Sequence, residues 1–184
     1  MRGIALAELL LCWIAWWYPF LFRAPHFQNR PSITVPWPTR IGLLLETSAF
    51  GISFYFHLPI LESAGALRTV LGMAVGVPAV AMAWGSVTHL GRQFRLHAGL
   101  YDDHELVRTG PYAIVRHPIY SGLLLALLGT AIAFGEIRGL IGVALAGIGW
   151  RLKSLVEERF MLEEFGEQYT RYRHDVNALI PFVY

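Results

Sequence analysis

Paired glutamates, histidines, tyrosines and a lysine gather in the second half of this 184-residue chain, among apolar segments. Three short runs carry them, at 104–107, 110–120 and 153–158. Lys153 and Glu157 are four residues apart, so on a helix they share one face and could hold a zwitterion or two oppositely charged ligands. Ionisable groups are costly near a membrane, and the leading reason to keep them there is chemistry on a lipid-borne substrate.

The residues between these runs predict how the polar groups are presented. Gly110-Pro111 predicts a turn, and Pro118 suits the first turn of a helix, where its missing N–H costs nothing. His117 then lies at the helix start, beside free backbone donors. Each feature alone has a structural explanation; the lysine–glutamate pair, for example, could be a surface ion pair worth about 0.3–0.5 kcal/mol. Their joint occurrence at the ends of two neighbouring helices favours a functional site.

The composition is that of an integral membrane protein. Hydrophobic residues make up 55% of the chain and charged residues only 15%, whereas a soluble domain carries about 25% charge. The net charge of +2 gives no reason to expect a nucleic-acid partner. Cys12 is the single cysteine, which excludes an intrachain disulfide. We expect no metal site, since no Cys/His cluster has ligand spacing, and no dinucleotide fingerprint, since no strand precedes the glycines at 142–149.

Apolar segments near the length that crosses a bilayer as a helix, about 20 residues, recur five times. We therefore predict an all-α, polytopic membrane protein with a single integral-membrane domain: two helices in residues 1–66, and a catalytic core with three helices and a C-terminal tail in residues 67–184. The first span is expected to be retained rather than cleaved, because no small-residue cleavage site follows it. The expected spans are Gly3–Phe22, Ile41–Leu61, Leu67–Leu90, Ile119–Phe134 and, after a tight turn at 135–138, a fifth that begins near Gly139, leaves the membrane near Trp150 and continues in water through Phe160.

The basic residues are placed unevenly across these spans. Twelve of the 15 lysines and arginines lie in the first loop, the third loop and the C-terminal tail, which share one side of the membrane, and only Arg2, Arg68 and Arg138 lie on the other. By the positive-inside rule the richer side faces the cytosol. The polar runs therefore predict a cytosolic cofactor pocket formed by the third loop, the last helical hairpin and the tail.

Three ionisable residues, Glu8, Glu46 and His57, fall within or near apolar spans. Such residues are often functional, but for Glu8 and Glu46 we expect a place near a helix end with access to interfacial water. The small residues at positions 142, 146 and 149 recur close to helical spacing and predict close packing of the fifth helix against a neighbour.

The polar runs and the tail form an ordered series of motifs: His-Glu-Leu-Val (104–107), Gly-Pro-Tyr (110–112), Arg-His-Pro-Ile-Tyr (116–120), Glu-Glu (157–158), Phe-Gly-x-x-Tyr-x-x-Tyr (165–172) and Ile-Pro (180–181). In their order and spacing these motifs resemble the isoprenylcysteine carboxyl methyltransferase family. Related motifs occur in phospholipid N-methyltransferases and in membrane sterol reductases. The resemblance covers about residues 85–184, and the first two helices contribute little to it.

The resemblance implies S-adenosylmethionine-dependent methyl transfer to a lipid or prenylated small-molecule substrate from the bilayer. It implies that Lys153 contacts the substrate, at a position where the family commonly has arginine, and we expect Arg116 to contact the substrate as well. Position 97 is usually glutamine in the family. The cofactor-binding residues that the resemblance implies are His97, His104, Glu105, Leu106, Val107, Tyr112, His117, Pro118, Ile119, Tyr120 and Glu157.

The charge of the substrate decides which catalytic groups are needed. A carboxylate needs no general base, and Lys153 would neutralise and position it, whereas an amine must lose a proton that His117 or Glu158 could accept. We favour the carboxylate. The alternatives are a phospholipid-type N-methyltransferase, an NADPH-dependent sterol-type reductase and a non-catalytic membrane subunit.

Overall fold

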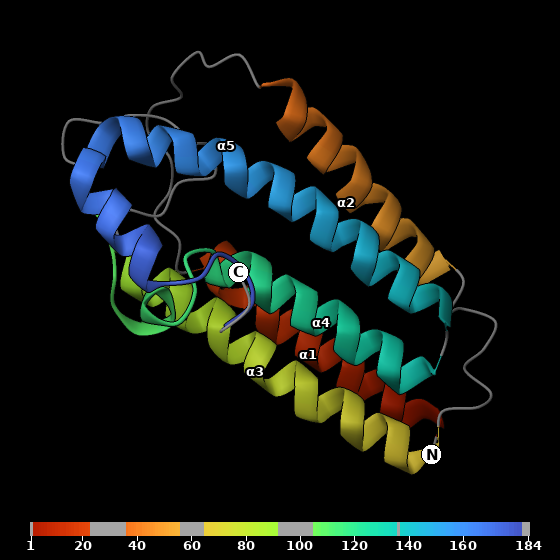
Figure 1. Ribbon diagram of the computed structural model, residues 1–184. Helices are drawn as coiled ribbons and strands as arrows, with labels where there is room; N and C mark the ends of the chain where they lie inside the picture. Colours follow the sequence, from red (N-terminus) through yellow and green to blue (C-terminus); the bar gives the residue numbers. More distant parts are fainter. Residues whose placement is uncertain (1, 23–35, 56–64, 92–104, 136, 182–184) are drawn as a thin grey trace.

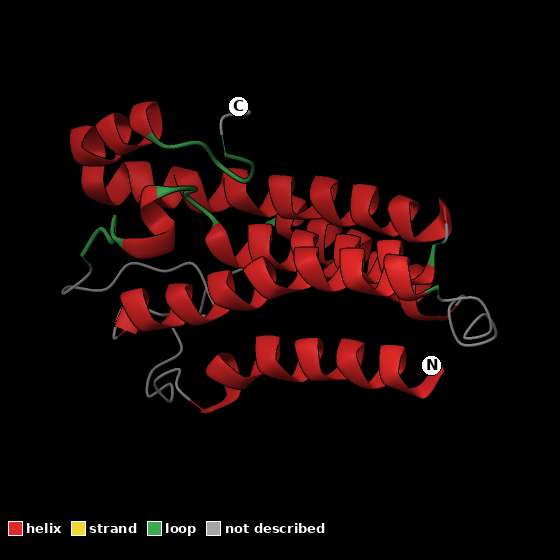
Figure 2. Ribbon diagram, turned by 90° about the horizontal axis from the view of Figure 1, so that it is seen from below, coloured by secondary structure: helices red, strands yellow, loops and turns green. Residues whose placement is uncertain are grey.

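The computed structural model describes residues 2–22, 36–55, 65–91, 105–135 and 137–181 (Figure 1). In this part of the chain the secondary structure is helical, apart from an isolated parallel bridge between Val115 and Asn177 (Figure 2). The prediction of an all-α fold is confirmed for these residues. The elements are α1 (Arg2–Phe22), α2 (Trp37–Tyr55), α3 (Ala66–Leu90), the 3-10 helix η2 (Gly110–Ala113), α4 (Pro118–Phe134) and α5 (Ile137–Asp175).

The apolar blocks of the sequence predicted most helix bounds closely. α1, α3 and α4 each begin one residue before the expected position and end where expected. α2 begins at Trp37, four residues earlier than predicted, and the last part of its predicted span lies outside the described residues. The expected turn after α4 is made by Gly135, whose φ of 68° is the left-handed conformation that glycine adopts without strain.

Two helices, Ala66–Leu90 and Ile137–Asp175, are long and apolar enough to cross a membrane, and Leu10–Phe22 and Pro118–Phe134 are shorter apolar helices. Many large hydrophobic side chains on these helices point outward, among them Leu11, Val77 and Ile148. In water such a surface would aggregate, whereas in a bilayer it meets lipid tails. The fold is therefore that of a membrane protein.

Two pairs of helices make the closest contacts, α3 with α4 and α2 with α5, and successive helices run in opposite directions (Figure 1). Glycines allow both approaches. A Cβ on Gly72 would lie 2.6 Å from the Gly129 carbonyl oxygen, and one on Gly149 would lie 2.8 Å from the Gly42 carbonyl oxygen. Because lipid provides no hydrophobic force between helices, backbone contact of this kind is what holds membrane helices together. The close packing predicted for the small residues of the fifth helix is confirmed.

The end of α5 folds back toward the start of α4. Gly166, at φ 49° and ψ −121°, breaks the helical conformation, and the last turns of α5 double back at this end of the bundle, toward the start of α4 (Figure 1). Tyr169 and Tyr172 are buried in this return segment. The tail then pairs with the residues before α4, where the backbone N–H of Arg116 donates to the Asn177 carbonyl at 2.8 Å. This return brings the C-terminal motifs to the polar start of α4.

Candidate active site

One face of α5 carries Trp150, Lys153 and Glu157, at spacings of three and four residues that align them along the helix. This face lies against the first turn of α4, where the Tyr120 ring stacks on Trp150 with centroids 6.2 Å apart and planes 6° apart. The His117 ring also stacks on the Tyr120 ring, and their centroids are 5.8 Å apart. A line of parallel rings therefore borders the charged groups.

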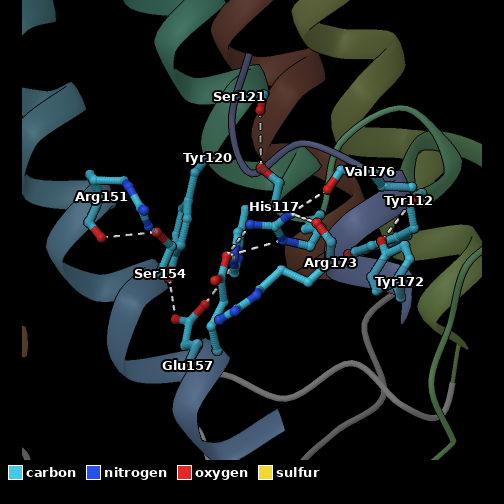
Figure 3. Close-up of polar contacts among 12 residues, drawn as sticks. Tyr112, His117, Tyr120, Ser121, Arg151, Ser154, Glu157, Tyr172, Arg173 and Val176 are labelled. Carbon is cyan, nitrogen blue, oxygen red and sulfur yellow. Dashed lines mark hydrogen bonds and ion pairs between the residues drawn. The ribbon is translucent and has the colours of Figure 1, made fainter. Parts of the chain in front are cut away.

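His117 lies between two carboxylates (Figure 3). Its Nδ1 is 3.4 Å from Glu157 Oε2, and its Nε2 is 3.2 Å from Glu158 Oε1. Burial by itself lowers the pKa of His117, but hydrogen bonds and charge from both carboxylates outweigh it, so the pKa lies above its usual value. Two ring nitrogens that both face acceptors fit the protonated imidazolium, which donates from each. The Tyr120 hydroxyl donates to Glu157 Oε1.

The guanidinium group of Arg116 donates hydrogen bonds to other groups of the protein. Its Nε and one terminal nitrogen donate to Glu158 Oε1 at 3.1 and 2.9 Å, and its other terminal nitrogen donates to the carbonyl oxygens of Arg173, at 2.9 Å, and Val176 (Figure 3). Its side chain is 9% exposed. Arg116 therefore ties α5 and the tail to the start of α4. Its expected contact with the substrate stays a prediction, and this geometry does not favour it.

Lys153 reaches a third helix. Its Nζ is 3.0 Å from Glu46 Oε2 on α2 and 5.2 Å from the centre of the Tyr120 ring. The expectation that Glu46 lies near a helix end is wrong, because α2 begins earlier than predicted and Glu46 falls at its midpoint. An ion pair, rather than interfacial water, satisfies its charge. Of the other two ionisable residues expected in apolar spans, Glu8 is on α1 with its side chain undescribed, and His57 lies outside the described residues.

The loop before α4 reaches the same region through Tyr112. This residue is buried in η2, and its carbonyl oxygen accepts from the Tyr172 hydroxyl at 2.6 Å (Figure 3). Burial raises the pKa of the Tyr112 hydroxyl above its usual value, and the charge of Glu157 adds to this effect. Arg108 lies over the Tyr172 ring at 5.5 Å and donates to the Gln168 carbonyl at 2.6 Å. The return segment of α5 thus holds the loop in place.

The remaining predicted cofactor residues differ in how they are placed. Pro118 is buried at the start of α4, and Ile119 packs against the apolar core. Glu105 is exposed, whereas Leu106 and Val107 are half-buried ahead of η2. The predictions for His97 and His104 lie outside the described residues. Among the described residues of the predicted site, the structure brings together two groups: the residues at the start of α4 and the residues on the polar face of α5.

The described charges at this junction balance, since three cationic side chains meet three carboxylates: Arg116, His117 and Lys153 against Glu46, Glu157 and Glu158. Glu157 is the most exposed of the six, at 32%. The junction is therefore a largely buried polar cluster bordered by aromatic rings, in which cationic and anionic side chains lie next to one another.

Sequence reasoning missed Trp150 and Glu46. Trp150 could have been found, because it precedes Lys153 by three residues and Glu157 by seven on the same helical face. Glu46 gave no such signal, because only the packing of α2 on α5 brings it near Lys153.

An apolar cavity lies elsewhere, between α1, α3 and α4. Its lining includes Trp13, Met73, Ala126 and Thr130. On α4 these residues are more than a turn beyond Tyr120, and they offer almost no polar group. The cavity is therefore separate from the polar junction and has no chemistry of its own.

Comparison with known proteins agrees with the motifs. The model of the phospholipid methyltransferase family matches residues 67–168. A probable protein-S-isoprenylcysteine O-methyltransferase of Oryza sativa subsp. indica is 33% identical over 122 residues, which are 65% of this chain and 60% of the rice protein. The protein-S-isoprenylcysteine O-methyltransferase of Dictyostelium discoideum is 26% identical over 205 residues, covering 100% of this chain and 79% of that protein.

A solved structure is also similar, that of the eukaryotic intramembrane Ras methyltransferase, isoprenylcysteine carboxyl methyltransferase. The TM-score is 0.54 at 25% sequence identity, over 83% of this chain and 55% of that chain. The chain spans 60% of the length of the rice relative. Because the family model covers more than half of the chain, the chain belongs to the phospholipid methyltransferase family, in which isoprenylcysteine carboxyl methyltransferases are its relatives, as the motifs indicated.

Proposed function

We propose that the protein transfers a methyl group from S-adenosylmethionine to the carboxylate of a membrane-borne acceptor, a prenylated cysteine like those named for its relatives. Membership of a methyltransferase family supports methyl transfer over the reductase and the non-catalytic subunit. The observation that carries the proposal is that Lys153 and Glu157 lie on one face of α5 and both reach Tyr120, Lys153 at its ring and Glu157 at its hydroxyl group.

The residues at the junction fit the methyl donor. S-adenosylmethionine has a sulfonium and an ammonium group, which suit a carboxylate and aromatic faces. Glu157 is a carboxylate that remains partly exposed, and Tyr120 and His117 hold it in place. These three residues, with Tyr112 behind them, would hold the donor. When bound, S-adenosylmethionine supplies a methyl group already activated by its positive sulfur.

The groups of the chain suit an acceptor that needs no base. Lys153 can neutralise and orient a carboxylate, whose oxygen is already nucleophilic. Both ring nitrogens of His117 face carboxylates, those of Glu157 and Glu158, so neither nitrogen is free to accept a proton from an acceptor. Glu158 accepts from both Arg116 and His117 and is 6% exposed. An amine acceptor, which must lose a proton, is therefore served less well, and it remains the second candidate because the matching family is named for phospholipids.

We further propose that the five helices each cross the membrane, that residues 67–184 form the catalytic core, and that the polar junction faces the cytosol. The match of the family model to residues 67–168 supports the core. The acceptor would reach the site sideways between helices, and the soluble donor would reach it from the cytosol. The acceptor carboxylate would then meet Lys153 beside Tyr120, where α5 faces α4.

Methyl transfer can be tested with membranes that contain the protein and S-adenosylmethionine labelled on its methyl group. We expect label in a prenylated cysteine that mild base releases as methanol, because a methyl ester is base-labile. Base-stable label in a lipid would show N-methylation and contradict the carboxylate acceptor. A change in absorbance of NADPH, with no transfer of label, would identify a reductase.

The donor site can be tested in the same preparation with Glu157→Gln. This change removes the most exposed carboxylate of the junction, so we expect the Kd for S-adenosylmethionine to rise about tenfold or more, the loss of one charge-assisted contact. Glu167→Gln is the matched control, since Glu167 is 89% exposed and pairs only along the surface with Arg171. An unchanged Kd in Glu157→Gln would remove this residue from the donor site.

A further inference from the structure

Glu46 and Lys153 form an ion pair at the middle of α2. Glu46 lies nine positions from each end of Trp37–Tyr55, or about 13 Å along the helix. The two side chains are only 21% and 15% exposed, and their charged atoms are 3.0 Å apart. A half-buried ion pair on an apolar helix is costly to form, and it is more costly to break because removing one partner leaves the other charge alone. The cost of the Glu46–Lys153 pair indicates that it has a function.

α2 holds the Lys153 side chain along its whole length. A Cβ on Gly42 would lie 2.8 Å from Lys153 Cγ. The absence of a side chain at Gly42 therefore makes space for the methylene groups of Lys153 to pack against α2. Glu46, one helical turn further on, receives the ammonium group. On the side away from α2, the Tyr120 ring lies 5.2 Å from the same nitrogen. The lysine head is therefore clamped between α2 and α4.

We propose that Glu46 is a positioning residue for the acceptor: it holds the Lys153 ammonium beside Tyr120, where the acceptor carboxylate binds. This inference rests on the proposed function, in which Lys153 contacts the acceptor. A lysine head has three N–H donors on a flexible stem. One donor given to Glu46 fixes the head, and the other two stay available to a carboxylate.

The same arrangement accounts for lysine at position 153, where the resemblance leads us to expect arginine. A planar guanidinium presents two parallel donors and needs little help to face a carboxylate, whereas a lysine head would turn toward water unless it is held. Gly42 and Glu46 supply that hold. Both lie on α2, outside the region that the family model matches, and they act through the packing of α2 on α5.

The inference is tested by steady-state methylation of N-acetyl-S-farnesylcysteine by purified protein. We expect Glu46→Gln to raise the KM for this acceptor about tenfold or more, with kcat at saturating acceptor changed much less, since a loosened Lys153 weakens acceptor binding. The Kd for S-adenosylmethionine should stay as in the wild type, which also shows that the variant is folded. Glu46→Asp keeps the charge but withdraws it by one methylene, and should give a smaller rise in KM. Thr47→Ala, an exposed neighbour that bonds only to its own helix, is the control.

A charge exchange separates positioning from a merely structural ion pair. Glu46→Lys combined with Lys153→Glu restores an attractive pair, so thermal stability should return toward that of the wild type. Methylation of the carboxylate should not return, because a negative group now lies beside Tyr120. Recovery of both stability and activity would overturn the inference.

Two other outcomes distinguish this inference from the proposed function. If Lys153→Met loses acceptor binding while Glu46→Gln keeps the wild-type KM, Glu46 is not a positioning residue, although Lys153 remains the acceptor contact. If Lys153→Met keeps the wild-type KM, Lys153 does not contact the acceptor, and both the inference and that part of the proposed function fail.

Discussion

The His117 ring is held between two carboxylates and should carry its proton over a wider pH range than an exposed histidine. Arg116 shares the Glu158 carboxylate, and Tyr120 shares the Glu157 carboxylate, so these groups also set the charge around the ring. The pKa of His117 is raised in the folded protein, whereas it is about 6.5 in the unfolded chain. Its contribution to stability is therefore complete below the unfolded value and is lost as pH rises through the folded value.

We expect His117→Gln to destabilise the protein most at acid pH. At pH 5.5 the loss should be about 2–3 kcal/mol, the usual size for hydrogen bonds to charged groups. As pH rises through the raised pKa of His117, the wild-type histidine loses its proton, so the two proteins should unfold at closer temperatures. Thermal unfolding in detergent at several pH values measures this difference. A gap between wild type and variant that is equal at both ends of the range would show that His117 is not held as a cation.

Single residues of the site could be predicted when they were close together in the sequence or on one helical face. His117, Tyr120 and Glu157 were expected in one pocket, and the structure brings them together through hydrogen bonds and an ion pair. Glu46 could not be assigned, because its role depends on a partner more than 100 positions away. An acidic residue in an apolar helix signals that a partner exists but does not identify the partner.

Among the helices, α5 is the element whose shape matters most to the site. Gly166 adopts φ 49° and ψ −121°, a conformation that side chains disfavour, and the last turns of the helix reverse there. That reversal allows Tyr172 to donate to the carbonyl oxygen of Tyr112 and allows the tail to pair with the residues before α4. The turn at Gly166 is therefore a precondition of the closed site.

Replacing Gly166 should test this role. Gly166→Ala meets no atom within 4 Å, so its cost is backbone strain alone, about 1–3 kcal/mol of unfolding free energy. The Kd for S-adenosylmethionine should rise with it, because the loop held by the return segment loosens. Gly51→Ala also meets no atom within 4 Å, but it lies inside α2, where alanine is favoured by about 1 kcal/mol. If both changes had the same effect, the special conformation of Gly166 would be unimportant.

The sequence predicted where helices lie better than how they pair. Apolar blocks and the turn at Gly135 set the bounds of α3 and α4 within one residue. The pairing of α2 with α5 was not predictable. Helices that are apolar on all sides carry no polar face, so their sequence does not show which side contacts a neighbouring helix. Gly42 and Gly149 mark the contact only once the partner is known, since glycines occur at many other positions in these helices.

Across the whole molecule, polar and basic residues collect at one end of the bundle. The starts of α2 and α4, the end of α3 and the return segment of α5 lie at that end, and the opposite end contains the turn between α4 and α5 (Figure 1). At the opposite end, the described basic residues are Arg2, Arg68 and Arg138, each in the first turn of a helix that begins there. By the positive-inside rule we expect the polar end to face the cytosol, where the proposed soluble methyl donor is found.

Cysteine labelling can test this orientation, because a helix that crosses the membrane must present its two ends to different compartments. With Cys12 replaced by alanine, a cysteine introduced at Glu167 reports on the return segment, which is 89% exposed at that side chain. A cysteine at Ile137, 72% exposed at the start of α5, reports on the other end. In spheroplasts of a bacterial host, a membrane-impermeant maleimide should label Ile137→Cys at once and Glu167→Cys only after permeabilisation. The reverse pattern would place the site outside the cytosol. Immediate labelling of both positions would mean that α5 does not cross the membrane. Donor and acceptor could then not approach the junction from different phases, as proposed.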